Sequence, residues 1–410
     1  MGAGIDAELV RKLEQLGRVS DVPGELTRTF LSPAMQRAND LVGKWMRQAR
    51  LETTVDAAGN LIGRLAGPHR EAPTLVLGSH LDTVRNAGKF DGALGVLLPI
   101  VALGELRRRG VTLPFAIEVV GFSEEEGVRF SSAYLGSKGF CGRLKAADLA
   151  LRDEAGISVA EAMAGAKPRR KMRDGKSSHR DWLGYFEVHI EQGPVLEKRN
   201  LAVGVVSAIA GQSRFRLRWT GKAGHAGTTP MDLRRDALAG AAEFALAVEA
   251  LARKTSGLVA TVGQVSVRPG AANVIPGETV HSLDVRHARD AVRKKALFQL
   301  GRLAASIARK RGLTVHWQRT QDNPATACAR ELTATLARSV KKIQGPCPSL
   351  VSGAGHDGVV VSLEMPITML FVRCRDGLSH HPDEYASGRD LGVALKVTID
   401  FLEALARQQA

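Results

Sequence analysis

The sequence lacks the features that mark secreted, disulfide-linked and membrane-spanning proteins. Its 410 residues include only four cysteines, and no two of them form a CxxC pair. No apolar signal-peptide core follows the first residues, and Asp6 stands where a myristoylation motif needs Ser or Thr. The longest apolar stretch, residues 94–103, is too short to cross a bilayer and predicts a buried helix. We therefore expect a cytoplasmic protein with reduced thiols and no membrane partner.

Aromatic residues and acids are also scarce. Aromatic side chains make up 5% of the sequence, and 57 Lys and Arg exceed 42 Asp and Glu, which gives a formal net charge of +15. A basic balance suggests a polyanionic partner, but surfaces that bind RNA combine basic residues with aromatic ones that stack on bases. We therefore expect no nucleic-acid partner. Residues 167–181 contain seven Lys and Arg, and we interpret them as a solvated loop, with an anion-binding arm as the alternative.

The pattern of helices and strands predicts an α/β fold. Apolar residues make up 44% of a chain whose length exceeds what one core usually serves, so we expect two domains. Predicted helices alternate with short apolar strands, as in a mostly parallel sheet flanked by helices. The helices are expected at 6–16, 33–50 and 92–108, and the strands at 74–77 and 115–122.

A second, smaller domain is expected to interrupt the first. Strands are predicted at 213–220, 258–267, 278–286 and 313–319, with helices at 232–253 and 290–310. This β-α-β-β-α-β order is the ferredoxin-like split motif. We therefore assign residues 213–327 to an inserted α+β domain, and 1–212 with 328–410 to the larger catalytic domain. A helix at 329–342, a strand at 367–373 and a helix at 390–407 are expected to return to the first sheet.

Potential metal ligands concentrate in five short segments. Histidine and carboxylate side chains without cysteine suit Zn²⁺, Mn²⁺, Co²⁺ or Ni²⁺, whereas an all-oxygen Mg²⁺ or Ca²⁺ site would not need histidine. Glycines around them allow the chain to converge on a small volume. Two of the segments follow predicted strands, where parallel sheets bind ligands. The segments are 78–95, 123–130, 189–194, 224–238 and 377–384.

Two local spacings suggest roles for the side chains. His80 and Asp82 are two apart on an extended chain and point the same way, so His80 can bind a metal while Asp82 orients it. Glu125 and Glu126 are adjacent and are expected to diverge, so that one binds metal and the other transfers a proton.

Together, these segments resemble the dinuclear-metal amidohydrolases related to the aminoacylase and carboxypeptidase metallopeptidases. The branch contains allantoate amidohydrolase, N-carbamoyl-L-amino acid hydrolase, ureidoglycolate amidohydrolase and β-ureidopropionase. The resemblance covers most of the chain in the same order. It implies an inserted lid and dimerisation domain, a homodimer, and two divalent ions per subunit, Mn²⁺ or Zn²⁺, with Co²⁺ or Ni²⁺ as alternatives. His189, where exopeptidases carry an acid, disfavours an aminopeptidase or deacylase.

The resemblance also implies a ligand set. His80 and His189 would bind one metal and Glu126 and His380 the other, with Asp91 bridging the two. His381 is the alternative to His380 and is disfavoured by the family spacing.

Further roles come from the same resemblance. Glu125 would be the general base and Asp82 would orient His80. The residues implied to contact substrate are Gln192, His225, Asn273, Arg286, Gly355 and His356. Among them, His225 would reach the oxyanion across a dimer interface after domain closure, and Arg286 would hold a substrate carboxylate. The alternatives are a turn-forming role for Asn273 and a surface position for Arg286.

The reaction predicted by this resemblance is hydrolysis of a ureido C–N bond in a small carboxylate. Residues 27–46, 189–197 and 369–384 resemble the allantoate version, so allantoate would give ureidoglycine, ammonia and carbon dioxide in purine catabolism. An N-carbamoyl-L-amino acid is the alternative substrate, followed by ureidoglycolate and β-ureidopropionate. A non-catalytic anion- or nucleic-acid-binding protein on the same fold is disfavoured because Asp91, Glu125 and Glu126 are all retained.

Overall fold

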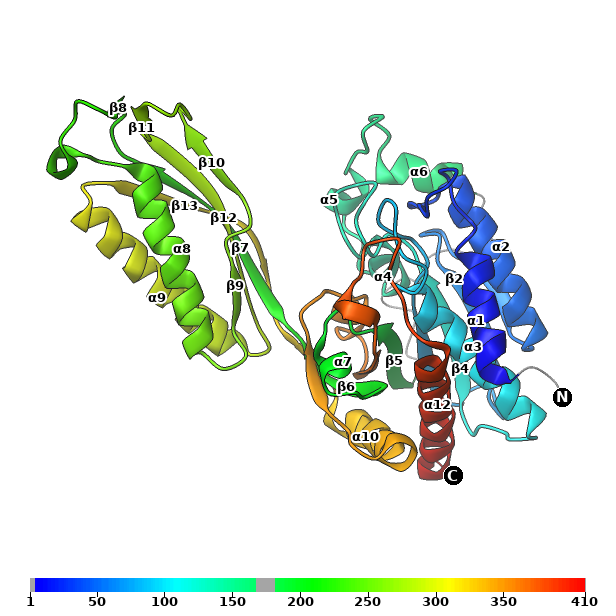
Figure 1. Ribbon diagram of the computed structural model, residues 1–410. Helices are drawn as coiled ribbons and strands as arrows, with labels where there is room; N and C mark the ends of the chain where they lie inside the picture. The colour runs from blue at the N-terminus through cyan, green and yellow to red at the C-terminus, as the bar shows by residue number, and fades with distance from the viewer. Residues whose placement is uncertain (1–3, 167–180, 410) are drawn as a thin grey trace. The chain divides into compact units, whose positions relative to one another are not determined.

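The computed structural model describes residues 4–166 and 181–409, which form two compact units (Figure 1). Unit 1 comprises Met1–Ser207 and Cys328–Ala410, and unit 2 comprises Ala208–Ala327. Unit 2 thus begins at Ala208 rather than at residue 213, where the sequence placed the boundary. The basic segment 167–181 lies outside the described residues, apart from Asp181.

Unit 1 is built on a mixed sheet whose centre is parallel. The neighbouring strands β4, β3, β5 and β16 run parallel, and antiparallel strands extend the sheet at both sides. The α/β prediction is therefore confirmed. In sheet order the strands are β1 (Glu52–Val55), β2 (Leu61–Leu65), β4 (Ala116–Phe122), β3 (Thr74–His80), β5 (Trp182–Ile190), β16 (Ile367–Val372), β6 (Val203–Ile209) and β14 (Thr326–Ala327), with β15 (Ser349–Ser352) also on β6.

The longest apolar run of the sequence forms the central helix of unit 1. Helix α3 (Ala93–Arg108) packs on β3 and β5, and α1 (Ile5–Leu16) and α12 (Gly388–Gln409) pack on it in turn. Leu94, Leu97 and Leu98 are fully buried, as expected for a helix that is apolar on all sides. The other helices are α2 (Pro33–Gln48), α4 (Leu135–Phe140), α5 (Ala146–Leu149), α6 (Val159–Gly165), α7 (Val195–Lys198), α10 (Arg330–Gln344), α11 (Gly358–Val361) and the 3₁₀ turn η2 (Arg375–Gly377).

The sequence-based elements differ from the structure in two ways that matter for function. The strand expected at 74–77 continues to His80, which makes His80 a strand residue with a fixed direction. Strand β5, which was not predicted, is a central strand of the sheet and carries His189. Strands β1, β2 and β6 were also not predicted.

Unit 2 has the ferredoxin-like order that its sequence predicts. Its strands pair antiparallel in the order β10-β12-β7-β13, and the strand expected at 258–267 is two short strands that both pair with β12. Unit 2 has its own hydrophobic core, which includes Leu217, Trp219 and Phe244. The elements are β7 (Gly211–Thr220), β8 (Gly224–His225), η1 (Met231–Leu233), α8 (Ala237–Lys254), β9 (Val259–Thr261), β10 (Val265–Arg268), β11 (Val274–Ile275), β12 (Glu278–His287), α9 (Asp290–Lys310) and β13 (Thr314–Asn323).

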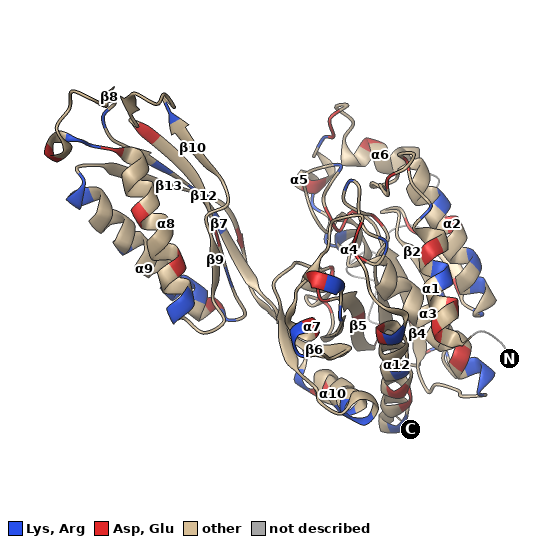
Figure 2. Ribbon diagram, in the orientation of Figure 1, with Lys and Arg blue, Asp and Glu red and all other residues tan. Residues whose placement is uncertain are grey.

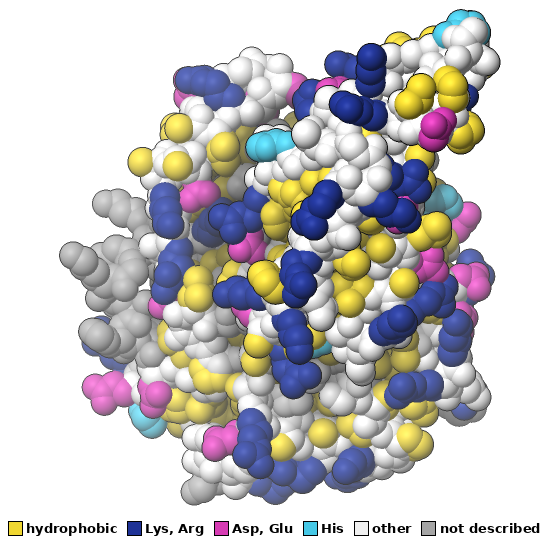
Figure 3. Space-filling view, turned by 90° about the vertical axis from the view of Figure 1, so that its left-hand side faces the viewer, with side chains coloured by type: hydrophobic (Ala, Val, Ile, Leu, Met, Phe, Trp, Pro, Cys, Tyr) yellow, Lys and Arg dark blue, Asp and Glu magenta, His cyan; other side chains and the backbone are white. Residues whose placement is uncertain are grey.

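Basic residues are distributed over the surface. Figure 2 shows Lys and Arg on the helices of both units, and on the face in Figure 3 they are spread among apolar side chains without forming one patch. Among the described residues, no helix is both long and apolar enough to cross a membrane.

Two glycines of α3 test how tightly this helix packs. A Cβ atom at Gly95 would lie 2.3 Å from the carbonyl oxygen of Val188 in β5, whereas a Cβ atom at Gly104 would have no neighbour within 4 Å. Gly95→Ala should therefore lower the free energy of unfolding by about 1–3 kcal/mol through overpacking. Gly104→Ala should raise it by up to about 1 kcal/mol, because alanine favours the helix. Urea denaturation measures both, and equal effects would contradict the packing of α3 on β5.

Candidate metal centre

The predicted metal ligands of unit 1 meet at the carboxyl edge of the parallel strands. His80 is the last residue of β3, and His189 stands near the end of β5. Glu125 and Glu126 follow β4, and Asp91 lies just before α3. Because parallel strands end at a common edge, residues far apart in the sequence converge there.

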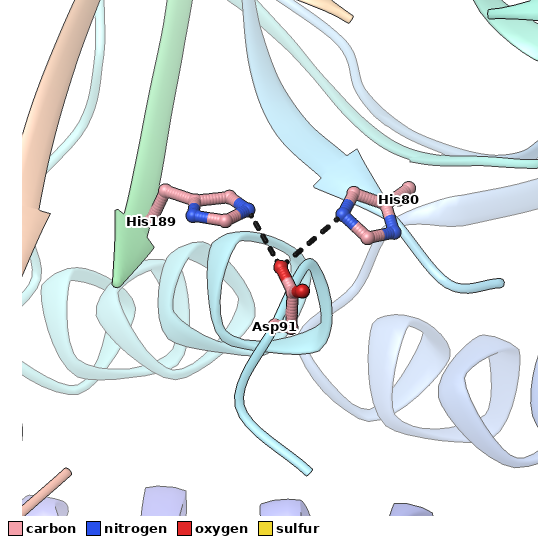
Figure 4. A group of neighbouring side chains, drawn as sticks. All are labelled: His80, Asp91 and His189. Carbon is pink, nitrogen blue, oxygen red and sulfur yellow. Dashed lines mark ion pairs between the residues drawn. The ribbon is translucent and has the colours of Figure 1, made fainter. Parts of the chain in front are cut away.

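Asp91 is the centre of this cluster (Figure 4). Its Oδ1 lies 3.0 Å from Nε2 of His189 and 3.6 Å from Nε2 of His80. Its Oδ2 lies 3.1 Å from Nε2 of His380, which in turn is 3.4 Å from Oε1 of Glu126. The two oxygens of one carboxylate thus face two different sets of ligand atoms.

The other ring nitrogens show which form of histidine the fold prepares. Nδ1 of His80 lies 3.0 Å from the carbonyl oxygen of Asp82, and Nδ1 of His189 lies 2.9 Å from that of Ile190. A carbonyl only accepts hydrogen bonds, so each Nδ1 carries a proton, and the Nε2 atom of each ring is left to face Asp91. The contact with Asp91 is therefore favourable only when Nε2 carries a proton or a cation lies between the two atoms.

The electrostatics of the cluster lead to the same conclusion. Burial acts to raise the pKa of Asp91, but hydrogen bonds from His189, His380 and His80 outweigh it and hold that pKa well below its ordinary value. The hydrogen bond to Asp91 is the main cause that raises the pKa of His380 to about 9. Burial lowers the pKa of His80, yet Asp91 and the nearby carboxylates raise it well above the usual range. The cluster therefore stabilises cations.

Two overlapping groups have the dimensions of metal sites. The ligand atoms of His80, Asp91 and His189 lie within 4.8 Å of one another, and so do those of Asp91, Glu126 and His380. Both groups combine imidazole and carboxylate and share Asp91. The residues present therefore fit the pair of divalent cations that the resemblance implies.

The three consecutive glutamates differ in orientation. Glu124 is buried away from the cluster, and its Oε1 accepts the backbone N–H groups of Arg129 and Phe130 at 2.9 and 3.0 Å. Glu125 and Glu126 were expected to diverge, but an oxygen of each lies within 4.8 Å of the other and of His80. That expectation was wrong because alternation belongs to extended strands, whereas Glu124 has a φ of +53° and turns the chain.

Burial dominates the titration of this pair. Burial raises the pKa of Glu126 to about 7. Burial also raises the pKa of Glu125 well above its usual range, and the negative charges of Glu126, Asp357 and Asp82 add to this effect. A glutamate with a raised pKa can hold a proton near neutral pH, as a proton-transfer group must.

Asp82 acts differently from the prediction. Its main-chain oxygen, rather than its carboxylate, makes the short contact with His80, and the carboxylate Oδ1 is 3.7 Å from Nδ1 of that ring. The carboxylate accepts the backbone N–H groups of Glu125 at 3.1 Å and Glu126 at 3.2 Å. Asp82 thus holds two parts of the site. Its main-chain oxygen contacts the ring of His80, and its carboxylate holds the turn that presents Glu125 and Glu126.

Three of the residues implied to contact substrate lie in unit 1. Nε2 of Gln192 donates to Oδ2 of Asp91 at 3.2 Å. His356 is buried with its ring 4.5 Å from that of His189, and its Nε2 is 2.7 Å from the hydroxyl of Ser352. Gly355 precedes it, and a Cβ atom there would collide with the hydroxyl of Tyr134. The structure therefore places Gln192 and His356 directly beside predicted metal ligands.

The other three lie in unit 2, at two separate places, one on its main sheet and one at a two-stranded ribbon. His225 and Asn273 are neighbours on the β8–β11 ribbon, where the N–H of Ala226 donates to the carbonyl of Asn273 at 2.9 Å. Arg286 lies near the far end of β12, and its Nε and Nη2 donate to the two carboxylate oxygens of Asp284 at 3.0 and 2.9 Å. The fork predicted to hold a substrate carboxylate is thus already oriented on a carboxylate of this chain.

Several residues of the site were not singled out from the sequence. Ser379 and Glu384 flank His380 and contact Asp91, and their place in the segment 377–384 was the only sequence signal. Glu187 lies two residues before His189 on β5, so strand alternation could have placed it on the same face. It is fully buried and accepts the hydroxyl of Ser79 at 2.6 Å.

The chain is similar to proteins of known families over nearly its whole length. Residues 76–404 match Peptidase family M20/M25/M40. Allantoate deiminase 1 of Glycine max is 38% identical over 97% of this chain and 89% of the relative. N-carbamoyl-L-amino acid amidohydrolase of Geobacillus stearothermophilus is 41% identical over 95% of this chain and 96% of the relative. An amidase of the hydantoinase/carbamoylase family from Burkholderia multivorans has a crystal structure that matches with a TM-score of 0.92 and 32% identity over 97% of each chain.

Fold and site thus define a hydrolase of the metal-dependent peptidase type with an inserted antiparallel unit. The chain belongs to the M20/M25/M40 peptidase family, within the group of amidohydrolases that includes the allantoate deiminases and the N-carbamoyl-L-amino acid amidohydrolases. It is a hydrolase of C–N bonds in linear amides, and the resemblance stated from the sequence is confirmed.

Two adjacent histidines offer a matched test of the metal centre. Both rings are about half exposed, but Nε2 of His380 contacts Asp91 and Glu126, whereas Nδ1 of His381 accepts the N–H of Asp383 at 3.2 Å. His380→Ala should lose one of two bound ions or weaken its binding at least about 10-fold, because a direct ligand is removed. His381→Ala should bind metal like the wild type. Metal content after gel filtration measures both, and a metal loss confined to His381→Ala would reverse the assignment.

Proposed function

We propose that this protein hydrolyses the ureido C–N bond of a small carboxylate, and that the substrate is allantoate, which gives ureidoglycine, ammonia and carbon dioxide. The arrangement around Asp91 supports the proposal, since two ligand sets share one carboxylate beside the buried Glu125. The similarity to the allantoate deiminases of Glycine max favours allantoate. The 41% identity to a carbamoyl-amino acid amidohydrolase favours an N-carbamoyl-L-amino acid as the second candidate.

In this proposal, five side chains of unit 1 hold two divalent ions, Mn²⁺ or Zn²⁺. His80 and His189 bind one ion, Glu126 and His380 bind the other, and Asp91 bridges them. Such ions, when bound, polarise a carbonyl and lower the pKa of water from 15.7 to about 7. Two of the ligand rings are already oriented, because backbone carbonyl groups hold the rings of His80 and His189 in place.

Glu125 would carry the proton during hydrolysis. It would accept a proton from water as the new C–O bond forms at the ureido carbon, and would deliver it to the nitrogen as the C–N bond breaks. A positioned acid–base group contributes roughly 10²–10⁴-fold to such a rate. Asp82 would keep Glu125 in place through the backbone N–H that it accepts.

The inserted unit would complete the site from two copies of the chain. An extended strand rises about 3.3 Å per residue, so Arg286 lies roughly 26 Å from Glu278 at the start of β12. His225 and Asn273 are on the ribbon that precedes this start. One copy of unit 2 therefore cannot bring all three residues around one small substrate. A homodimer in which Arg286 comes from one subunit and His225 with Asn273 from the other would do so.

Exposed apolar side chains of unit 2 support an interface there. Among the described residues, large apolar side chains that are more than half exposed are concentrated in this unit, and Leu363 is the one other example. Those in unit 2 are Met231, Leu233, Leu246, Val259, Val265 and Phe298.

Ammonia release from a substrate panel tests the proposed reaction. Allantoate, N-carbamoyl-L-amino acids, ureidoglycolate and β-ureidopropionate should be assayed with the purified protein, with the protein after chelator treatment, and after return of Mn²⁺ or Zn²⁺. We expect the highest kcat/KM with allantoate, loss of activity on chelation, and recovery with metal, because the ligand set needs its cations.

Controls make this result specific. Glu125→Gln should retain metal but release ammonia roughly 10²–10⁴-fold more slowly, which excludes a contaminating hydrolase. A higher kcat/KM with a carbamoyl-amino acid would replace allantoate by the second candidate. Full turnover after complete metal removal would contradict the proposed chemistry.

Mixing two inactive variants tests the shared site. His225→Ala and Arg286→Ala should each be strongly impaired, because each removes a substrate contact from every site. After the subunits exchange, half of the dimers are mixed and each holds one complete site, so about a quarter of wild-type activity should return. If both residues act within one subunit, or if the protein is a monomer, mixing restores nothing.

A further inference from the structure

We propose that Glu384 is a positioning residue for the metal centre, and that it holds the bridging carboxylate of Asp91 through a closed ring of hydrogen bonds with Ser379 and Gln192. This inference rests on the proposed function, since it assigns Asp91 to two metals. It concerns a residue that contacts neither metal nor substrate.

The backbone side of the ring lies at the start of the Asp91 segment. Oε1 of Glu384 accepts the N–H of Phe90 at 2.9 Å and the N–H of Asp91 at 3.0 Å. One carboxylate oxygen thus fixes two successive peptide groups directly before α3. The second of these N–H groups belongs to Asp91, so the position of the Asp91 Cα atom depends on Glu384.

The side-chain half of the ring returns to the same aspartate. The hydroxyl of Ser379 lies 2.8 Å from Oε2 of Glu384 and 3.3 Å from Oδ2 of Asp91. Nε2 of Gln192 lies 3.0 Å from that hydroxyl and 3.2 Å from Oδ2 of Asp91. With Ser379 donating to Glu384, both amide protons of Gln192 are used, one on Ser379 and one on Asp91. The ring is closed, and every donor in it has an acceptor.

The backbone around the ring is strained and closely packed. Gln192 has a φ of +54° and His380 a φ of +57°, a left-handed conformation that is strained for residues other than glycine. A Cβ atom at Gly88 would lie 2.3 Å from that of Glu384, and one at Gly377 would lie 2.6 Å from the backbone of Gly193. Such strain persists only where neighbouring contacts hold it, and the ring bonds link the segments that contain both strained residues.

This ring connects ligand geometry to the substrate side of the site. Asp91 receives its direction from Glu384 through the backbone and from Gln192 through its side chain, and Ser379 accepts the other amide proton of that glutamine, which is implied to touch substrate. Glu384 is 2% exposed, so its loss would leave the N–H groups of Phe90 and Asp91 buried without an acceptor. The expected consequence is a bridging carboxylate that is free to rotate away from one metal.

Metal affinity tests the role directly. Mn²⁺ or Zn²⁺ binding should be measured by competition with a chromophoric chelator for the full-length wild type, Glu384→Ala, Ser379→Ala and Asp383→Ala. Removing such a supporting partner typically weakens metal binding 10–100-fold, which we expect for Glu384→Ala, with a smaller loss for Ser379→Ala. Asp383→Ala is the matched control, because its side chain is 78% exposed in the same loop, and it should bind like the wild type.

A conservative variant separates positioning from general stability. Glu384→Gln keeps an acceptor oxygen for the backbone N–H groups, so it should recover most of the affinity lost in Glu384→Ala, and thermal unfolding of the metal-free variants should not follow the same order. Wild-type affinity in both Glu384→Ala and Ser379→Ala would overturn the positioning role of Glu384 and would leave the proposed function standing. If Glu384→Ala does not fold, unchanged affinity in Ser379→Ala overturns it. A wild-type protein that binds no divalent ion would overturn the metal centre itself.

Discussion

The geometry of the site depends on one buried carboxylate that faces three imidazole nitrogens. Asp91 is 5% exposed, and its two oxygens lie 3.0 to 3.6 Å from Nε2 atoms of His189, His380 and His80. Backbone carbonyls direct the Nδ1 protons of His80 and His189 away from it, so that Nε2 of each ring faces the carboxylate. Positive charge, from protons on these rings or from metal ions held between them and Asp91, stabilises such a cluster in a buried place.

The fold brings this carboxylate to the histidines through close backbone packing. Gly92 has a φ of +64°, and a Cβ atom there would lie 2.4 Å from the ring of His80. Glycine is therefore required for Asp91 to approach that ring at the start of α3. Three residues further along α3, Gly95 lets the helix lie against the carbonyl oxygen of Val188 in β5. The site and the central helix thus share one packing constraint, so changes in the core of unit 1 will also move the ligands.

The sequence indicated which side chains meet in the site better than it indicated the strands that carry them. The resemblance named His80, Asp91 and His189 as ligands, and the structure brings these three together. Strand β5 was missed because Glu187 and His189 interrupt its apolar pattern, although both are buried as completely as their neighbours. The ferredoxin-like order of unit 2 was predictable because its strands alternate. Contacts such as that of Glu384 with the N–H of Asp91 join residues 293 positions apart, and no local pattern encodes them.

In the proposed function, substrate choice rests on different residues from the predicted metal ligands. The carboxylate of Asp284 accepts hydrogen bonds from Arg286, from Arg214 at 2.9 Å and from Gln212 at 2.7 Å, and these donors help to hold its pKa below the ordinary value. The plane of the Arg286 guanidinium is thereby fixed, which would lower the entropy lost on binding a substrate carboxylate in the proposed function. Allantoate and N-carbamoyl-amino acids both pair a carboxylate with a ureido or carbamoyl group. A shared metal centre and a shared arginine would therefore accept either, and discrimination must come from side chains that contact the rest of the substrate. In the proposed function, substrate specificity would therefore be determined around Arg286 and Gln192 rather than at the predicted metal ligands.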